Sequence, residues 1–439
     1  MRRPRQSKTD RFFLYGLFAV VIALLFVAGS VAGIFATGGS SADPPLPTPT
    51  PPSQDPGIVE PGPDEPEPEP EPDIRTMTLL AVGDITAHLT QINQAHLGDD
   101  EYDFTPSFEI IAPYIEAVDL SVGSLETCQA SPSISFMGYT GYTAFPCFNA
   151  PLALSEALTQ AGFDLMAMAN NHSLDRGLTG LKETLENVRG LGLTTFGTHL
   201  NEEEQMTPVI KEFNGINVAF LSYTFSTNAI PVPQGHEYSV NYIENFNTVV
   251  PIVEEMERAR RDGADLIAIY MHWGAMYVTE PHPHLRNVAG QLAEAGADLI
   301  LGSHPHVVQP MEWFYNEEPD GSTRISLATY SMGNFVSNQH YPANPTDLVQ
   351  YGKILNFEIS KDMESGATWI SGVDYEVTWV HRGWRHRILP LSEVMEQEPA
   401  NFNITAEQKQ ELIEGYARNK EIIERYGFVT DAPPEVVIK

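Results

Sequence analysis

The chain has 439 residues, of which 58 are acidic and 25 are basic, giving a formal net charge of -33. A protein this acidic lacks the basic surface that binding to nucleic-acid phosphates requires, so no nucleic-acid partner is expected. The length is ample for a large domain with its own buried core. Two cysteines are too few for a disulfide-stabilised scaffold or a cysteine zinc cluster.

The N-terminal segment has the pattern of a membrane anchor. Residues 1–11 carry five basic side chains and one acidic one, and residues 12–36 carry no charge at all. An uncharged stretch of this length can cross a bilayer as a tilted helix. The basic flank is predicted to stay in the cytoplasm, which places the rest of the chain outside the cell membrane. A signal peptide cleaved near Ala36 is the alternative, although a cleavable apolar core is usually shorter.

Residues 37–75 are predicted to form a disordered linker. Thirteen prolines lie between Pro44 and Pro72, and the segment ends in DEPEPEPEPD. Proline and mutually repelling carboxylates keep such a segment extended, and it holds too few apolar residues to form a core. The expected function of this linker is to hold the following domain away from the membrane.

A folded domain is predicted over residues 76–393, followed over 394–439 by a helical tail that packs back on it. The tail carries apolar residues at helical spacing, among them Leu412, Ile413 and Tyr416. From Ile74 onward 48 acids face 20 bases, a net charge of about -28. The acidity therefore belongs to the folded part as well as to the linker.

Several short apolar runs in this domain end in polar residues that can bind metals. Their ends are Asp84 after MTLLAVG, Glu126 after AVDLSVGSL, Asn170, Asn171 and His172 after FDLMAMA, His272 after ADLIAIYM, and His304 and His306 after ADLILGS. A further run, INVAFLSYTF, has no such ending. Helical patterns separate several of the runs, so the sequence predicts a largely parallel, layered α/β domain. In such domains the carboxyl ends of the strands carry the polar site.

The side chains at these strand ends belong to one chemical class. Carboxylates, an amide carbonyl and imidazoles form the oxygen and nitrogen set that suits divalent Mn, Fe, Zn or Mg. A single histidine or a single Gly-Asp pair would indicate little by itself. Five strand ends that each finish in a candidate ligand predict a metal site.

The domain contains an ordered series of motifs, namely Gly83-Asp84, Ser124-Leu125-Glu126-Thr127, Asn170-Asn171-His172, His272-Trp273-Gly274, Gly302-Ser303-His304-Pro305-His306 and Tyr330-Ser331-Met332-Gly333-Asn334-Phe335. This series resembles that of the CapA family, which is named for poly-γ-glutamate capsule synthesis and has a calcineurin-like metallophosphatase fold. The resemblance extends from about Met77 to Leu389.

The resemblance implies a role for each ligand-type residue. Asp84 and His306 would hold one divalent ion, and Asn171, His272 and His304 a second. Glu126 would bridge the two ions, and His172 would contact the negative charge that develops on the substrate. Two ions held this close activate water and clamp the oxygens of a phosphorus centre.

The sequence departs from the wider pattern at a few positions. Thr86 stands where a histidine is usual, and His88 is a candidate replacement for it. Ser124 and Met276 stand where an asparagine and an acidic residue are frequent. Asp175 is expected to cap or orient the helix that begins near Leu178.

Cys128 and Cys147 form a possible disulfide, because cysteines outside the cytoplasm can oxidise. Two buried thiols are the alternative. Cys128 lies two residues after Glu126, so a bond there would steady the loop that carries this ligand.

Two functions are compatible with the sequence. The first is a membrane-anchored, extracytoplasmic hydrolase with two metals that acts in poly-γ-glutamate synthesis or export, together with the synthase subunits. The second is a non-catalytic, metal-binding accessory or anchoring subunit of the same complex.

Overall fold

The computed structural model describes residues 72–318, 321–428 and 430. The anchor predicted over residues 12–36 and the linker up to residue 71 lie outside this range. Within the described range, no helix combines the length and the apolar character that crossing a membrane requires.

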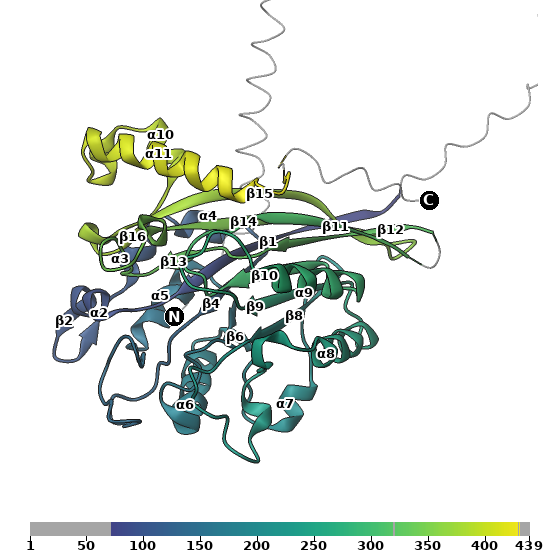
Figure 1. Ribbon diagram of the computed structural model, residues 1–439, viewed down its shortest axis with the longest axis horizontal. Helices are drawn as coiled ribbons and strands as arrows, with labels where there is room; N and C mark the ends of the chain where they lie inside the picture. Colours follow the sequence, from purple (N-terminus) through teal and green to yellow (C-terminus); the bar gives the residue numbers. More distant parts are fainter. Residues whose placement is uncertain (1–71, 319–320, 429, 431–439) are drawn as a thin grey trace, which may run out of the picture. The chain divides into compact units, whose positions relative to one another are not determined.

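Two β-sheets form the centre of the folded part (Figure 1). The eight-stranded sheet has the order β16 (Arg387–Pro390), β15 (Thr368–His381), β14 (Tyr351–Asp362), β1 (Ile74–Ile85), β4 (Leu120–Leu125), β5 (Leu165–Ala167) and β6 (Thr194–Phe196), with β13 (Asn334–Val336) also paired to β1. The six-stranded sheet has the order β11 (Met311–Glu317), β12 (Thr323–Thr329), β10 (Leu299–Ser303), β9 (Leu266–His272), β8 (Ile216–Thr224) and β7 (Val209–Phe213). A small hairpin joins β2 (His96–Gly98) to β3 (Glu101–Tyr102).

The expected parallel strands make up the middle of each sheet. β1, β4, β5 and β6 run parallel in one sheet, and β8, β9, β10 and β12 run parallel in the other. The outer strands differ from the expectation because they pair antiparallel. These are β14, β15 and β16 of the eight-stranded sheet, and β7 and β11 at the two edges of the six-stranded sheet. Short connections without a crossover helix join β7 to β8, β11 to β12, β14 to β15 and β15 to β16, so the alternating strand–helix pattern does not extend to these pairs.

The two sheets pack face to face. Leu79 and Val122 of the eight-stranded sheet share one hydrophobic cluster with Phe220, Ala268 and Leu301 of the six-stranded sheet. Strands covered on both faces are expected to be apolar almost throughout, and β4 and β9 are buried along their whole length. The parallel strands therefore end together at one edge of the double layer.

Helices cover the outer faces of both sheets. A second cluster joins Leu80 and Val82 of β1 to the helices α3 (Thr105–Phe108), α4 (Ala112–Glu116), α5 (Ala153–Ala161) and α6 (Gly177–Gly190). A third joins Ile267 and Ile269 of β9 to α8 (Val250–Arg261) and α9 (Pro283–Glu294). The remaining short helices are α2 (Leu89–Ala95), α7 (Glu202–Met206) and the 3-10 turns η1 (Glu237–Ser239), η2 (Glu244–Phe246), η3 (Asp347–Gln350), η4 (Arg382–Trp384) and η5 (Pro399–Phe402).

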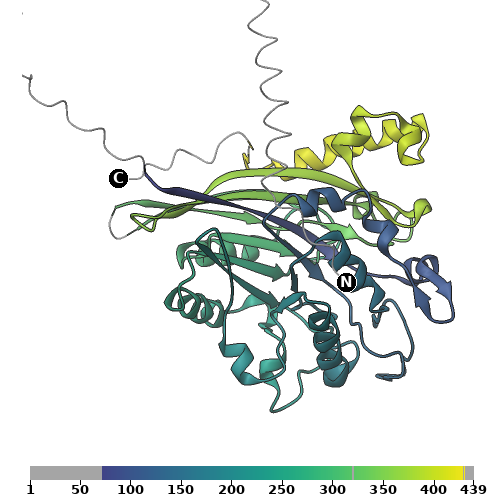
Figure 2. The same ribbon diagram turned by 180° about the vertical axis from the view of Figure 1, so that it is seen from behind.

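The last helices, α10 (Leu391–Glu396) and α11 (Ala406–Ile423), lie on the eight-stranded sheet. In both views α11 runs along β15 (Figures 1 and 2). Leu412 and Ile423 of α11 are buried in the same cluster as Val373 and Val377 of β15. The domain boundary expected at residue 393 falls inside α10. Strand β1 begins at Ile74, ahead of the expected domain start at residue 76, because Ile74 pairs with Asp362 of β14.

Candidate metal centre

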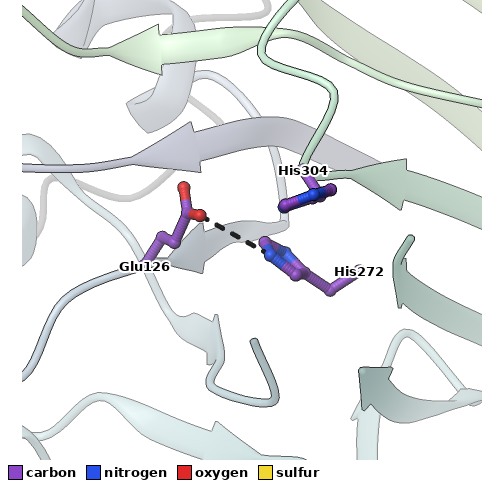
Figure 3. Close-up of side chains that lie close together, drawn as sticks. All are labelled: Glu126, His272 and His304. Atoms are coloured by element: carbon purple, nitrogen blue, oxygen red, sulfur yellow. Dashed lines mark ion pairs between the residues drawn. The ribbon is translucent and has the colours of Figure 1, made fainter. Parts of the chain in front are cut away.

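The polar strand ends predicted from the sequence meet at one place between the two sheets. Asp84 lies near the end of β1 and Glu126 directly follows β4. From the other sheet, His272 ends β9, and His304 directly follows β10. Figure 3 shows Glu126, His272 and His304 pointing toward one another.

Two glycines let the backbone reach these positions. A Cβ added to Gly83 would lie 2.0 Å from the carbonyl oxygen of Gly333, and one added to Gly302 would lie 2.0 Å from that of Tyr330. Any larger residue at position 83 or 302 would push neighbouring backbone apart. The Gly-Asp and Gly-Ser-His motifs therefore combine a close backbone contact with a ligand-type side chain.

The ligand-type atoms fall into two overlapping groups. Atoms of Glu126, His272 and His304 lie within 4.8 Å of one another, and so do atoms of Asp84, Glu126 and His306. All five residues are buried. Glu126 belongs to both groups, which is the position of a bridging ligand.

Glu126 lacks hydrogen-bond partners within the described part of the chain. Both of its carboxylate oxygens are buried and unpaired, and His272 Nε2 lies 3.5 Å from Oε1. Burial, followed by the nearby charge of Asp84, raises the pKa of Glu126 well above its usual value. An isolated buried carboxylate is costly unless a cation compensates it. The donor set and these two unpaired oxygens fit a pair of divalent ions.

Asp84 is fixed from two sides. Its Oδ2 accepts a hydrogen bond from the backbone N–H of His304 at 2.9 Å, and its Oδ1 accepts one from the Ser124 hydroxyl at 3.4 Å. Ser124, which replaces a frequent asparagine, thus supports a ligand-type carboxylate.

Each imidazole of the six-stranded sheet has a distinct environment. Ser303 Oγ lies 3.0 Å from Nδ1 of His272, which leaves Nε2 facing Glu126. Nδ1 of His304 is buried without a partner among the described residues. Nδ1 of His306 lies 3.0 Å from Oδ1 of Asn334. Contacts at one ring nitrogen orient the other toward a metal.

The pKa values of these imidazoles separate the two groups. Burial lowers the pKa of both His272 and His304 well below the usual value. Burial alone would also lower the pKa of His306, but the charges of Glu126 and Asp84 raise it to about 9. The rings of His272 and His304 are therefore neutral at pH 7, which is the form that binds metals.

Asn171 and His172 reach the site from the turn after β5. Oδ1 of Asn171 lies 2.8 Å from Nε2 of His272, so the amide carbonyl points at the second group. His172 belongs to neither ligand group. Its Nδ1 lies 2.7 Å from Oδ2 of Asp175, and Asp175 also accepts the backbone N–H of Phe148 at 2.5 Å.

This contact corrects the expectation for Asp175. Helix α6 begins at Gly177 after Arg176, and no side chain caps it. The buried Asp175 instead orients the ring of His172. Sequence reasoning looked for the partner of Asp175 in the helix that follows, whereas it lies three residues earlier in the same turn.

The two departures after Asp84 have different outcomes. Thr86 is buried and its hydroxyl bonds to the carbonyl of Val336 at 3.3 Å, so it faces a neighbouring strand. His88 is absent from both ligand groups. Its Nε2 lies 3.2 Å from the hydroxyl of Ser337, and its ring packs edge-on against Phe148. His88 therefore does not supply the missing ligand.

Asn228 is a site residue that sequence reasoning missed. It follows β8, whose apolar run INVAFLSYTF was taken to lack a polar ending. Its Oδ1 accepts a hydrogen bond from Nδ2 of Asn171 at 3.1 Å, and its Nδ2 lies 3.3 Å from Nδ1 of His172. The distance in sequence between β8 and Asn228 hid the signal, because only residues directly at a strand end were considered.

A turn with positive φ angles brings Asn228 into place. The N–H of Ile230 bonds to the carbonyl of Thr227 at 2.9 Å, and the two residues between them have φ angles of 52° and 60°. Glycine is preferred at the second of these positions, which Ala229 occupies. The chain therefore accepts a small strain here to present the Asn228 amide.

Cys128 and Cys147 do not form the disulfide that their sequence positions suggested. Cys128 and Cys147 are both free, buried thiols, which agrees with the alternative interpretation. Sγ of Cys128 lies 3.5 Å from the carbonyl oxygen of His172, so this thiol packs under the turn that carries the site histidine.

Comparison with known proteins supports the resemblance. The model of the family described as "Bacterial capsule synthesis protein PGA_cap" matches residues 78–339. The capsule biosynthesis protein CapA of Bacillus anthracis is 30% identical over 199 residues, which are 45% of this chain and 46% of that protein. The PGA biosynthesis protein CapA of Bacillus subtilis (strain 168) is 28% identical over 198 residues, covering 45% and 48% respectively. The chain thus spans about half the length of these curated relatives.

The solved structures that match this chain include the NAD nucleotidase NadN of Haemophilus influenzae. It has a TM-score of 0.42 and 11% identity, with 79% of this chain and 61% of that one covered. A putative 5'-nucleotidase from Staphylococcus aureus has a TM-score of 0.41 and 14% identity, with 78% and 58% covered.

The family match extends over more than half of the chain and contains every ligand-type residue described above. The chain belongs to the family of bacterial capsule synthesis proteins, PGA_cap.

Proposed function

We propose that this protein is a two-metal hydrolase that acts outside the cell membrane in the synthesis or export of poly-γ-glutamate. The observation that carries the proposal is the position of Glu126. Its two buried, unpaired oxygens lie in both ligand groups, which is the geometry expected of a bridge between two ions.

The residues present define where the ions would bind. Asp84, Glu126 and His306 would hold one divalent ion, and Glu126, Asn171, His272 and His304 the other. When bound, such ions lower the pKa of water and polarise a phosphoryl or carbonyl oxygen. Mn, Fe, Zn and Mg all suit this mixed set of oxygen and nitrogen donors.

His172 would act on the substrate without binding an ion. Oδ2 of Asp175 lies 2.7 Å from Nδ1 of His172, so Nε2 is the ring nitrogen that would face the substrate. The buried Asp175 carboxylate would stabilise positive charge on the ring, and a protonated Nε2 would then donate to the oxygen that gains negative charge. A positioned donor of this kind contributes about 10² to 10³ in rate.

A non-catalytic accessory subunit is the second candidate. The observation that favours it is the small number of ligand-type residues in the first group. Only Asp84 and His306 accompany Glu126 there, because the Thr86 hydroxyl bonds to the carbonyl of Val336 instead. An ion held there by three side chains would leave much of its coordination to water. The near -28 charge of the folded part argues against wide scaffolding of a polyanion, because like charges repel.

Localisation and partners follow from the sequence alone. The proposed arrangement has a cytoplasmic flank over residues 1–11, a single membrane helix over 12–36 and the catalytic domain outside. Poly-γ-glutamate and its synthase subunits are the proposed partners. Full-length protein should stay with membranes after a carbonate wash and should be cut by protease added outside the cell. Release of a soluble product beginning near Gly38 would instead establish cleavage.

One experiment separates the two candidate functions. Full-length protein would be loaded with Mn²⁺ and assayed for bound metal, phosphoester hydrolysis and shortening of poly-γ-glutamate. The hydrolase requires two ions per chain and turnover of at least one substrate. Fewer than two ions, with no turnover, would overturn the hydrolase and leave the accessory subunit.

A further inference from the structure

A cluster of basic side chains outside the two ligand groups has no assigned role. It consists of Arg382 in η4 together with His88, His340 and His386. Hydrogen bonds to Asn338 connect Arg382, His340 and His386, and His88 contacts the neighbouring Ser337. Oδ1 of Asn338 accepts Nε of Arg382 at 3.0 Å and lies 2.9 Å from Nε2 of His386.

The guanidinium of Arg382 is held in place but is not neutralised. His386 is fully buried and its other ring nitrogen lies 2.7 Å from Oε1 of Gln94, so the Asn338 acceptor is supported from behind. No carboxylate pairs with Arg382 within the described part of the chain, where its terminal nitrogens also lack hydrogen-bond partners. Burial lowers the pKa of this arginine. In a domain of charge near -28, a half-buried arginine without an acidic partner is unexpected.

His88 connects this cluster to the metal centre. Ser337, the residue before Asn338, has its hydroxyl 3.2 Å from Nε2 of His88. On its other side, the ring of Phe148 lies between the rings of His88 and His172, with centroid distances of 5.2 Å and 4.6 Å. Burial, then His306 and His172 of the site, and then His340 and Arg382, lower the pKa of His88 to about 3. The contacts of His88 thus lead through Phe148 to His172 on one side and to Ser337, next to Asn338, on the other.

We propose that Arg382 is an anion subsite that binds a second negatively charged group of the substrate, next to the group held at the metals. The inference rests on the proposed hydrolase function and narrows its substrate class to compounds with two anionic groups. A guanidinium whose Nε is already fixed presents its terminal nitrogens as a planar fork, which suits the two oxygens of a carboxylate or phosphate.

The test uses substrates that differ only in the second group. 4-Nitrophenyl phosphate has a neutral substituent, 4-carboxyphenyl phosphate carries a carboxylate, and hydroquinone bisphosphate carries a second phosphate. A hydrogen bond to a charged group typically changes binding affinity by about tenfold or more. Arg382→Gln in the full-length protein should therefore raise KM for the two doubly anionic compounds by about tenfold or more. The KM for 4-nitrophenyl phosphate should change by less than about twofold.

Arg387 provides a matched control. It lies in the neighbouring strand β16 but is paired with Glu109 at 2.6 Å and stacks over Trp384. Arg387→Gln removes the same charge and should leave all three KM values unchanged. Arg382→Lys keeps the charge but loses the fork, so it should show an intermediate KM. If Arg382→Gln raises all three KM values equally, or if Arg387→Gln has the same effect, the subsite is wrong.

A binding measurement separates failure of the subsite from failure of the proposed function. The hydrolase fails only if wild-type protein hydrolyses none of these compounds and does not shorten poly-γ-glutamate. In that case, calorimetry with 4-carboxyphenyl phosphate decides the subsite. Binding by wild type that is lost in Arg382→Gln and kept in Arg387→Gln supports the subsite without any turnover. Absence of binding by wild type, or equal binding by both variants, overturns it. Comparison of the carboxylate with the bisphosphate shows which anion is preferred.

Discussion

The two sheets contribute different chemistry to the candidate metal centre. The eight-stranded sheet supplies oxygen atoms of the ligand type, from Asp84, Glu126 and Asn171, and the six-stranded sheet supplies imidazole nitrogens, from His272, His304 and His306. Two carboxylates on one sheet repel each other and are costly to bury alone. Among the imidazoles of the opposite sheet, His306 has a raised pKa and offsets that cost where the sheets pack. The site is thus a property of the contact between the sheets.

This contrast predicts that the bridging carboxylate matters most. Glu126→Gln removes the negative charge shared by both groups, so both ions should bind at least about a hundredfold more weakly. Metal content measured across a Mn²⁺ titration tests this expectation. Glu255→Gln is the matched control. Glu255 is also buried, but it accepts a hydrogen bond from Tyr223 and belongs to neither ligand group. Retention of two ions in Glu126→Gln would contradict the bridging role.

His172 should affect turnover without affecting metals. His172→Ala is expected to keep both ions and to lose about 10² to 10³ in kcat, because it removes one donor to the developing charge. The control is His199→Ala, which removes another buried histidine that belongs to neither ligand group. A loss of metal in His172→Ala would show that this residue is a ligand.

The nitrogen ligands should separate the two ions. His304→Ala should lower the metal content to about one ion per chain, because it should empty the ion position that His304 shares with Asn171 and His272. His306→Ala should reach the same stoichiometry by emptying the Asp84 position. Each variant serves as the control for the other, and Mn²⁺ spectroscopy distinguishes the ion that remains. Loss of both ions in either variant would indicate one shared site.

The smallest effect is expected at Asn228, which touches a ligand without being one. Its Oδ1 accepts Nδ2 of Asn171 and so keeps the Asn171 carbonyl directed at His272. Asn228→Ala should weaken only the second ion, by about 10- to 100-fold, as is typical of an outer hydrogen-bond partner. Ala229→Gly relieves the positive φ angle beside it and should leave metal affinity unchanged. An unchanged second ion in Asn228→Ala would show that Asn171 is oriented without it.

Much of the site could be predicted from local pattern. The ligand-type residues stand at the ends of apolar runs, and the carboxyl ends of parallel strands meet at one edge. The family expected from the motifs is confirmed. Asp84, Glu126, His272, His304 and His306 therefore come together as expected.

The errors arose where a contact depends on the path of a loop. Asp175 pairs with His172 and caps no helix. Asn228 reaches the site from a turn beyond its strand. Cys128 and Cys147 remain thiols.

The sequence by itself determined the parallel strands that end in ligand-type residues, the residue types at the site and the family, because these depend on periodicity and on residue type at strand ends. Only the tertiary structure decided which sheet supplies which ligand, how the ligands divide into two groups around Glu126, and which polar residues support them. Those features depend on distances between side chains far apart in the chain, and such distances are set by the packing of the two sheets.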